Sequence, residues 1–128
     1  MLFNDKAYYK LNAMELFFFY LDSSDKNLIN LINGCLKKEG IAVNDCVAYA
    51  FANEYEDYDY DGGYFGSEGV KFVIQEPIAT HEKCEVYTLE EFYNYLVEYT
   101  NEYLKHKKCS NSDEILKKLV EIKEKFSI

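Results

Sequence analysis

Hydrophobic side chains recur along the first third of the chain at steps of three and four residues, which is the period of an amphipathic helix. The spacing predicts a helix over residues 6–21 and a second helix that Ser24 or Asp25 caps and that ends before Gly40. The buried stripes of these two helices are expected to contain Ala7, Tyr8, Leu11, Met14, Phe17 or Phe18, and Leu21, followed by Leu28, Ile29, Ile32 and Leu36. The chain therefore opens with a helical pair.

The hydrophobic period changes to two after residue 41, where Val, Tyr and Phe alternate with smaller residues. The two sides of the predicted strand consist of Val43, Asp45, Val47, Tyr49 and Phe51, and of Cys46, Ala48, Ala50 and Ala52. A helix capped by Asp45 remains an alternative, but the β-branched and aromatic residues favour a strand. Two shorter strands are predicted at Val70–Gln75, which Pro77 ends, and at Cys84–Tyr87.

A capping box begins the clearest helix in the chain. The Thr88 hydroxyl is expected to accept a hydrogen bond from the Glu91 amide, while the Glu91 carboxylate accepts one from the Thr88 amide. This helix should run from Leu89 to about Lys107, and a last helix should follow Ser112. The inward-facing residues of the two helices are predicted to be Leu89, Phe92, Leu96, Tyr99 or Thr100, and Tyr103, then Ile115, Leu116, Leu119, Ile122 and Phe126. The order of elements predicts one α+β domain over residues 1–128, a small antiparallel sheet of about three strands flanked by N-terminal and C-terminal helical pairs.

The most unusual stretch is EYEDYDYDGGYFGSEG, residues 54–69, which we call the acidic segment. It contains six carboxylates and four tyrosines, and it has no Lys or Arg. We take ten of its residues as candidates for binding a partner: Glu54, Tyr55, Glu56, Asp57, Tyr58, Asp59, Tyr60, Asp61, Tyr64 and Glu68. Repulsion among like charges destabilises a compact state, so such a segment is typical of a protein that binds something cationic.

The negative charge of the chain is concentrated in its middle. The net charge is −9, and residues 54–104 contain thirteen acids and two lysines, so that the rest of the chain sums to +2. A negative domain repels phosphate backbones, so we expect a basic protein and no nucleic acid as the partner. All fourteen basic residues are Lys. The bidentate grip that Arg provides for phosphate is missing, which disfavours phosphoryl-transfer chemistry.

The acidic segment also fits the EF-hand calcium loop, D-x-D-x-D-G-x5-E. In that alternative the calcium ligands would be Asp57, Asp59, Asp61 and Glu68. Two other features do not fit an EF-hand. Position 8 of the loop is Tyr64, where EF-hands have an aliphatic residue, and the VKFVI that follows the loop is predicted to be a strand. Tyrosines among carboxylates suit a protein interface better, since Tyr buries a large rigid area and carboxylates steer a basic partner. A third interpretation packs the tyrosines on the sheet and leaves the acids solvated.

Little in the sequence indicates catalysis or a cofactor. His81 and His106 are predicted to be surface residues, and no nucleophile motif or phosphate-binding loop is present, so we expect a binding protein and not an enzyme. The four cysteines, Cys35, Cys46, Cys84 and Cys109, are not at metal-ligand spacing. Charged residues interrupt the apolar start of the chain, so we expect no membrane span, a cytoplasmic location and reduced, mostly buried thiols.

Three features together resemble the immunity proteins of contact-dependent growth inhibition (CDI) systems, specifically the ribonuclease-toxin immunity group. They are the acidic segment, the strand that begins Glu68-Gly69-Val70-Lys71-Phe72, and the EEFYNYL helix from Glu90 to Leu96, and they cover roughly residues 43–105. The resemblance implies a cytoplasmic protein that binds and neutralises one cognate nuclease toxin. We expect the protein to be a monomer. A ribonuclease presents a basic groove to RNA, and the acidic segment would complement that groove, with its carboxylates in place of phosphates and Tyr58, Tyr60 and Tyr64 as anchors.

Overall fold

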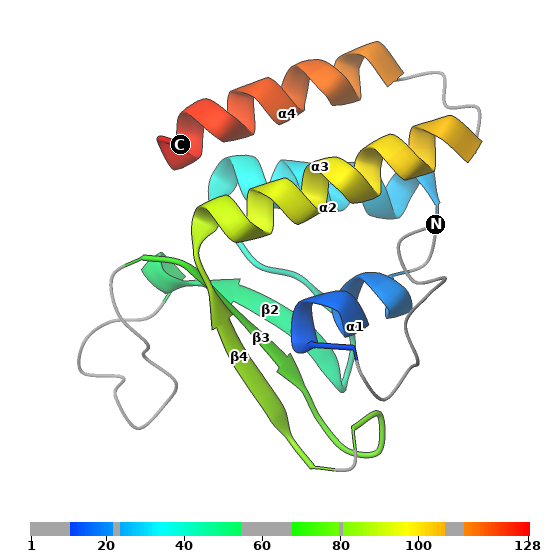
Figure 1. The fold of residues 1–128 in the computed structure, drawn as a ribbon, viewed down its shortest axis with the longest axis vertical. Coiled ribbons are helices and arrows are strands. Elements are labelled where there is room, and N and C mark those ends of the chain that lie inside the picture. The colour runs from blue at the N-terminus through cyan, green and yellow to red at the C-terminus, as the bar shows by residue number, and fades with distance from the viewer. Residues whose placement is uncertain (1–10, 22–23, 55–67, 80, 107–111) are drawn as a thin grey trace.

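The computed structural model describes residues 11–21, 24–54, 68–79, 81–106 and 112–128. Its elements are α1 (Ala13–Tyr20), α2 (Asp25–Lys37), β1 (Ala42–Asn44), β2 (Val47–Phe51), the 3-10 turn η2 (Ala52–Glu54), β3 (Val70–Ile74), β4 (Lys83–Tyr87), α3 (Leu89–His106) and α4 (Ser112–Phe126) (Figure 1). The strands form one antiparallel sheet in the order β1-β2-β3-β4. The predicted α+β class, with helices before and after the sheet, is confirmed.

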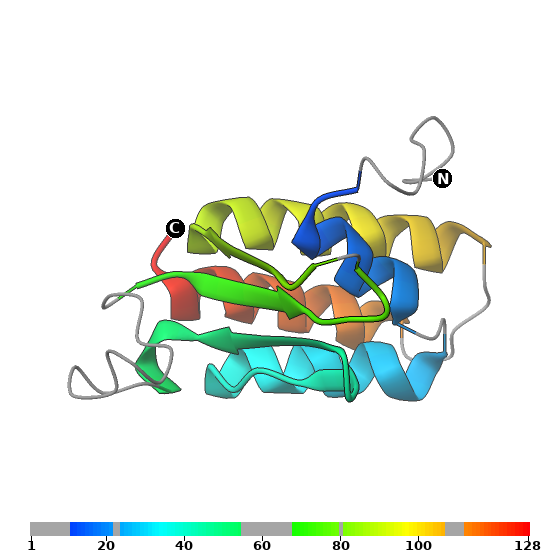
Figure 2. The same cartoon turned by 90° about the horizontal axis from the view of Figure 1, so that it is seen from below.

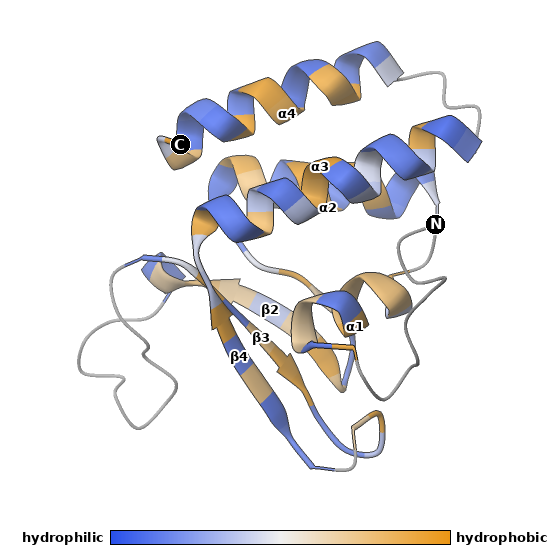
Figure 3. Ribbon diagram, viewed as in Figure 1, coloured by the Kyte–Doolittle hydropathy of each residue, from blue (hydrophilic) through white to orange (hydrophobic). Residues whose placement is uncertain are grey.

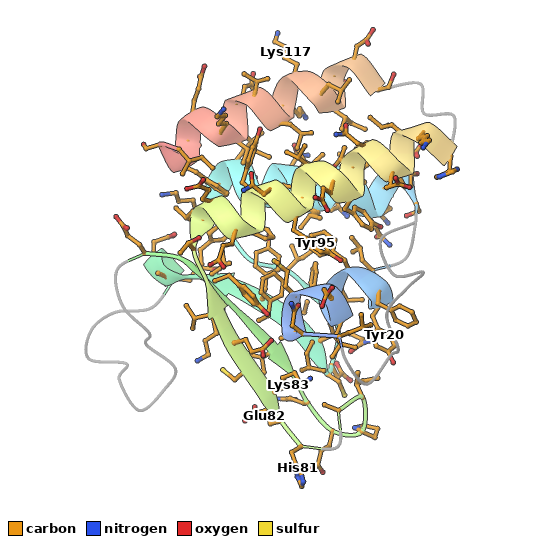
Figure 4. All side chains as sticks on the ribbon, viewed as in Figure 1. Tyr20, His81, Glu82, Lys83, Tyr95 and Lys117 are labelled. Atoms are coloured by element: carbon orange, nitrogen blue, oxygen red, sulfur yellow. The ribbon has the colours of Figure 1, made fainter. Side chains whose placement is uncertain are left out.

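The helices form two groups relative to the sheet. Helix α1 lies against β2, β3 and β4. The helices α2, α3 and α4 run side by side and form the second group (Figures 1 and 2). Two side chains of β4 hold the start of α1. The Ala13 amide donates to Glu85 Oε1 at 2.5 Å, and Lys83 Nζ, labelled in Figure 4, donates to the Leu11 carbonyl oxygen at 3.1 Å. The Tyr87 hydroxyl also donates to Glu85, at 2.7 Å, which orients the carboxylate toward the helix.

Aromatic rings fill the space between the sheet and the helices. The alternating residues of β2 and β3 that face inward are all buried: Val47, Tyr49, Phe51, Val70, Phe72 and Ile74. Figure 3 shows the hydrophobic colouring of β3, which lies in the middle of the sheet. Phe72 is central. Its ring centroid lies 5.1 Å from that of Tyr49 in β2, 5.4 Å from that of Phe17 in α1, and 5.7 Å from that of Phe92 in α3. One side chain therefore joins the sheet to both groups of helices.

The structure divides the strand predicted after residue 41 into β1 and β2, which gives four strands in place of about three. The Asn44 side chain causes this division, because its Oδ1 accepts a hydrogen bond from the Cys46 amide at 2.7 Å and closes a tight turn. Asp45 therefore lies in a turn and not on the buried side of a strand. The alternation predicted for residues 47–51 is confirmed, with Ala48 and Ala50 partly exposed on the other face.

The first helix is shorter than its apolar period predicts. The part of the predicted helix over residues 6–10 lies outside the described residues, and α1 begins at Ala13 because Asn12 and Glu15 form a capping box. Asn12 Oδ1 accepts from the Glu15 amide at 2.8 Å, and Glu15 Oε1 accepts from the Asn12 amide at 3.0 Å. In α4, Leu116 was expected to face inward but is 42% exposed. The buried residues on either side of it, Ile115 and Leu119, already occupy the inward positions.

Other local predictions are confirmed. Ser24 caps α2 by accepting from the Asn27 amide at 3.2 Å. The Thr88 hydroxyl accepts from the Glu91 amide at 3.0 Å, and Glu91 accepts from the Thr88 amide at 2.9 Å. Within the described part of the chain, no helix is both long and apolar enough to span a membrane.

The three cysteines in the described residues are free thiols in three different environments. Cys35 is buried and lies 3.6 Å from the Tyr49 hydroxyl, and burial raises its pKa to about 12. Cys46 is partly buried, whereas Cys84 is exposed on β4, so the expectation of mostly buried thiols is wrong for Cys84. Because the folded pKa of Cys35 is raised above its ordinary value of 9.0, its contribution to stability is present below pH 9 and is lost as the pH rises toward 12.

We expect Phe72→Ala to lower the free energy of unfolding by about 3–5 kcal/mol, because it removes the ring shared by the sheet and both groups of helices. Urea unfolding of the purified protein measures this change. Phe19→Ala is the matched control, since Phe19 is 48% exposed, and should cost about 1 kcal/mol or less. Equal losses for the two substitutions would contradict the central place of Phe72 in the core.

We expect iodoacetamide to alkylate Cys84 in the native protein at a pH of about 8 and to leave Cys35 unmodified, because the thiolate is the reactive form and burial disfavours it at Cys35. Mass spectrometry of peptides from a timed reaction gives both rates, and reaction in urea supplies the unfolded reference. Alkylation of the two thiols at similar rates in the native protein would contradict the burial of Cys35.

Candidate functional site

The structure locates the point at which the acidic segment joins the sheet. Glu54 and Glu68 are described, whereas the other candidate residues lie outside the described residues: Tyr55, Glu56, Asp57, Tyr58, Asp59, Tyr60, Asp61 and Tyr64. The acidic segment leaves the sheet after η2 and returns immediately before β3 (Figure 1). Its two ends are therefore fixed by the pairing of the two central strands.

The two ends of the acidic segment lie next to each other. Phe51 is paired with Val70 across the ladder, and one step further the Ala52 amide donates to the Gly69 carbonyl oxygen at 3.0 Å. Gly69 has a φ of +104°, and a Cβ on it would lie 2.7 Å from the Tyr87 carbonyl oxygen. Only glycine suits this position. The sheet thus brings the segment back beside β4 and the start of α3.

The carboxylate of Glu54 is held by backbone amides of two different elements. Glu54 Oε2 accepts from the Phe51 amide at 2.6 Å and from the Gly40 amide at 3.1 Å, and Oε1 lies 3.2 Å from the same Gly40 amide. The neighbouring Asn53 Nδ2 donates to the Lys38 carbonyl oxygen at 3.2 Å. These contacts connect η2 to the turn between α2 and β1, and nothing in the sequence pattern indicated them.

The described carboxylates at this end of the sheet have no lysine partner among the described residues. Glu68 is exposed, and Glu90 and Glu91 at the start of α3 are exposed as well, with Glu91 used in the helix cap. The ion pairs seen in the described ranges involve other carboxylates, such as Glu114 with Lys118 at 3.6 Å. The protein's own described lysines therefore leave the negative charge of Glu54 and Glu68 unpaired.

The flanks of the acidic segment differ from those of an EF-hand. The segment follows a 3-10 turn and precedes a strand, whereas an EF-hand loop joins two helices. Of the four alternative calcium ligands, Asp57, Asp59 and Asp61 lie outside the described residues, and the fourth, Glu68, is exposed. The described residues contain no group of three His, Cys, Asp or Glu that could hold a metal ion.

The two histidines lie at the surface, as predicted. His81 Nδ1 lies 4.0 Å from Glu76 Oε1, and Figure 4 shows His81 near the start of β4, at the end of the sheet opposite to the Phe51 and Val70 pair. His106 Nε2 lies 3.3 Å from Glu102 Oε2, one turn earlier on α3. Each imidazole therefore has a carboxylate neighbour on its own side of the molecule, and neither is next to Glu54 or Glu68 in the described contacts.

A groove of about 530 Å³ lies between the end of α1, the start of α2 and β1. Its lining consists of Tyr20, Leu21, Asn27, Asn30, Ile41, Ala42, Val43 and Asn44. These side chains are apolar groups, amides and one phenol, so the described lining contains neither a carboxylate nor an imidazole for acid–base chemistry. The residues of this groove come from separate parts of the chain and have no common motif, so no pattern in the sequence predicts the groove.

Comparison with known families gives one match. A family model described as "CDI immunity protein" matches residues 10–120, which include α1, α2, α3, the first part of α4, the strands β1 to β4 and the acidic segment. A search of curated proteins found no match, and a search of solved structures found none.

We expect millimolar calcium to leave the melting temperature of the protein unchanged, because the elements on either side of the acidic segment are not those of a calcium-binding hand. Thermal melts with calcium and with a chelator measure the difference. A ligand present at a hundredfold its dissociation constant stabilises the folded state by about 2.7 kcal/mol, so binding would raise the melting temperature by several degrees. Such a rise would restore the calcium interpretation.

Proposed function

The chain belongs to the CDI immunity protein family, and from this premise we propose that it neutralises a ribonuclease toxin by covering the toxin's RNA-binding groove with its acidic segment. Membership of the family implies that the protein neutralises a cognate CDI toxin. The nature of the toxin and the docking surface are our proposals. In this proposal residues 1–128 act as one immunity domain, and one copy binds one toxin domain in the cytoplasm.

The observation that carries the proposal is the attachment of a strongly acidic segment to the two central strands of the sheet. The segment contains six carboxylates and no Lys or Arg, and its described carboxylates have no lysine partner among the described residues. Concentrated charge of one sign raises the local concentration of an oppositely charged partner. A protein that binds RNA presents positive charge, so its RNA-binding groove has the required sign.

The proposed complex assigns different roles to the two residue types in the segment. The carboxylates of Glu56, Asp57, Asp59, Asp61 and Glu68 take the places of RNA phosphates and accept hydrogen bonds from toxin lysines and arginines. Tyr58, Tyr60 and Tyr64 supply rigid apolar area, which accounts for much of the binding energy at protein interfaces. Inhibition then follows from occupancy alone and requires no catalytic group in the immunity protein.

Electrostatic attraction of this kind acts mainly on the rate of association. Attraction between a negative segment and a positive groove raises association rates to about 10⁸ M⁻¹s⁻¹ at low salt, and the rate falls as salt screens the charges. A toxin that enters the cytoplasm must be bound before it cleaves its substrate, so rapid capture is the useful property. The tyrosines that become buried in the proposed complex would then determine how long the complex persists.

We expect the triple substitution D57K/D59K/D61K to slow association with the toxin domain by about tenfold or more at low salt. Stopped-flow mixing with an active-site-disabled toxin measures the rate at several salt concentrations. The wild-type rate should fall with salt more steeply than that of the variant, because the variant has lost the screened attraction.

The control is the triple substitution E82K/E121K/E124K, which changes the net charge by the same amount at three exposed sites outside the segment. We expect this variant to bind much faster than the segment variant. Equal slowing of the two variants would show that only net charge matters. A wild-type rate for the segment variant would remove the acidic segment as the docking surface.

A further inference from the structure

We infer that Glu54 is a positioning residue, which fixes the point where the acidic segment leaves the sheet and does not itself bind the toxin. This inference rests on the proposed function and assigns to Glu54 a role different from that of the other acidic residues. Sequence analysis placed Glu54 with the partner-binding carboxylates because it begins the acidic segment. Glu54 is an exposed residue, but its carboxylate accepts hydrogen bonds from backbone amides of its own domain.

The Glu54 carboxylate already has backbone donors from within the protein. Oε2 accepts from the Phe51 amide at 2.6 Å and from the Gly40 amide at 3.1 Å. Hydrogen bonds from amides to a carboxylate are charge-assisted and are about twice as strong as bonds between neutral groups. The Phe51 amide belongs to the last residue of β2, and Gly40 belongs to the connection between α2 and β1. One side chain therefore spans two elements at the start of the segment.

Gly40, whose amide donates to the Glu54 carboxylate, is itself fixed on the sheet. A Cβ on Gly40 would lie 1.9 Å from the Tyr49 carbonyl oxygen, so the backbone of Gly40 rests directly on β2. The next residue, Ile41, accepts a hydrogen bond from the Tyr49 amide at 3.0 Å. Glu54 thus anchors η2 to a rigid part of the backbone and not to a loop that could move with the segment.

Two further contacts hold the same turn. Asn53 Nδ2 donates to the Lys38 carbonyl oxygen at 3.2 Å, and the Ala52 amide donates to the Gly69 carbonyl oxygen at 3.0 Å. All three residues of η2 are therefore tied to the surrounding backbone, two through side chains and one through its amide. The acidic segment therefore begins, at Glu54, in a turn of defined position.

This anchoring affects binding through the fraction of molecules in the correct conformation. When only a fraction of the protein is competent to bind, the apparent dissociation constant rises by the inverse of that fraction. A loose η2 would let the segment begin in many directions, and the cost of selecting one of them would weaken the complex. The acceptor atoms of Glu54, more than its charge, would then determine its effect on binding.

Three variants separate these roles. Glu54→Gln removes the charge but keeps one oxygen, and this oxygen at the Oε2 position can still accept from both amides, whereas the contact of Oε1 with the Gly40 amide at 3.2 Å is lost. Glu54→Ala removes the charge and the acceptors. Glu85→Ala is the matched control, since Glu85 also accepts a backbone amide from another element, Ala13 at 2.5 Å, but lies under α1 and away from the segment.

We expect E54A to raise the toxin dissociation constant by about tenfold, the result when about one molecule in ten keeps the turn in place. E85A should bind within about twofold of wild type, and E54Q should lie between wild type and E54A, because it keeps one acceptor oxygen for both amides. All measurements are made well below the unfolding transition of each variant, so that loss of folded protein does not contribute. Amide hydrogen exchange at Gly40 and Phe51 should accelerate in E54A and return toward the wild-type rate in E54Q.

Each other outcome overturns the inference. If E54Q weakens binding as much as E54A, with a loss that shrinks at high salt, Glu54 is a direct charge contact. If E54A binds like wild type while D57K/D59K/D61K is impaired, Glu54 has no positioning role although the proposed docking surface stands. If E85A weakens binding as much as E54A, the effect reflects general loss of stability. A wild-type rate for the triple variant would instead reject the proposed function itself.

Discussion

The pairing of β2 with β3 is the constraint on which the rest of the structure depends. It aligns Tyr49 with Phe72, so that two aromatic side chains meet at the centre of the core, and it aligns Phe51 with Val70, where the acidic segment begins and ends. The same pairing therefore forms the buried face of the sheet, against which α1 and α3 pack, and fixes the two ends of the acidic segment. Stability and the proposed binding function share one set of backbone hydrogen bonds.

This arrangement explains how a small domain can keep six carboxylates in one stretch. Like charges repel, and the two described carboxylates of the segment, Glu54 and Glu68, are both exposed at one end of the sheet and outside the buried core. The sheet end is reinforced by hydrogen bonds from Glu54, Asn53 and Ala52 to neighbouring backbone. A rigid support lowers the cost of ordering a charged surface when a partner binds.

Local signals in the sequence predicted most of the fold. The alternation of Val47, Tyr49 and Phe51 and the Thr88 capping box each involve residues a few positions apart, so their physical causes are visible in sequence. The turn at Asn44 was missed because the alternating pattern continues across it. The hydrogen bond between Glu54 and Gly40 was not predicted, because Gly40 is fourteen residues away and contributes only a backbone amide, which every residue but proline has. The chemistry of the acidic segment was visible in sequence, but its attachment was not.

The central claim is that a toxin docks on the acidic segment at the β2 and β3 end of the sheet. Hydrogen–deuterium exchange of the protein alone and in complex with its cognate toxin domain tests this claim most directly, because it maps protection without any substitution. The account predicts that the toxin slows exchange chiefly in residues 52–70, with little change in α4 or in the groove between α2 and β1. Protection confined to α4 or to that groove, with residues 52–70 unchanged, would contradict it.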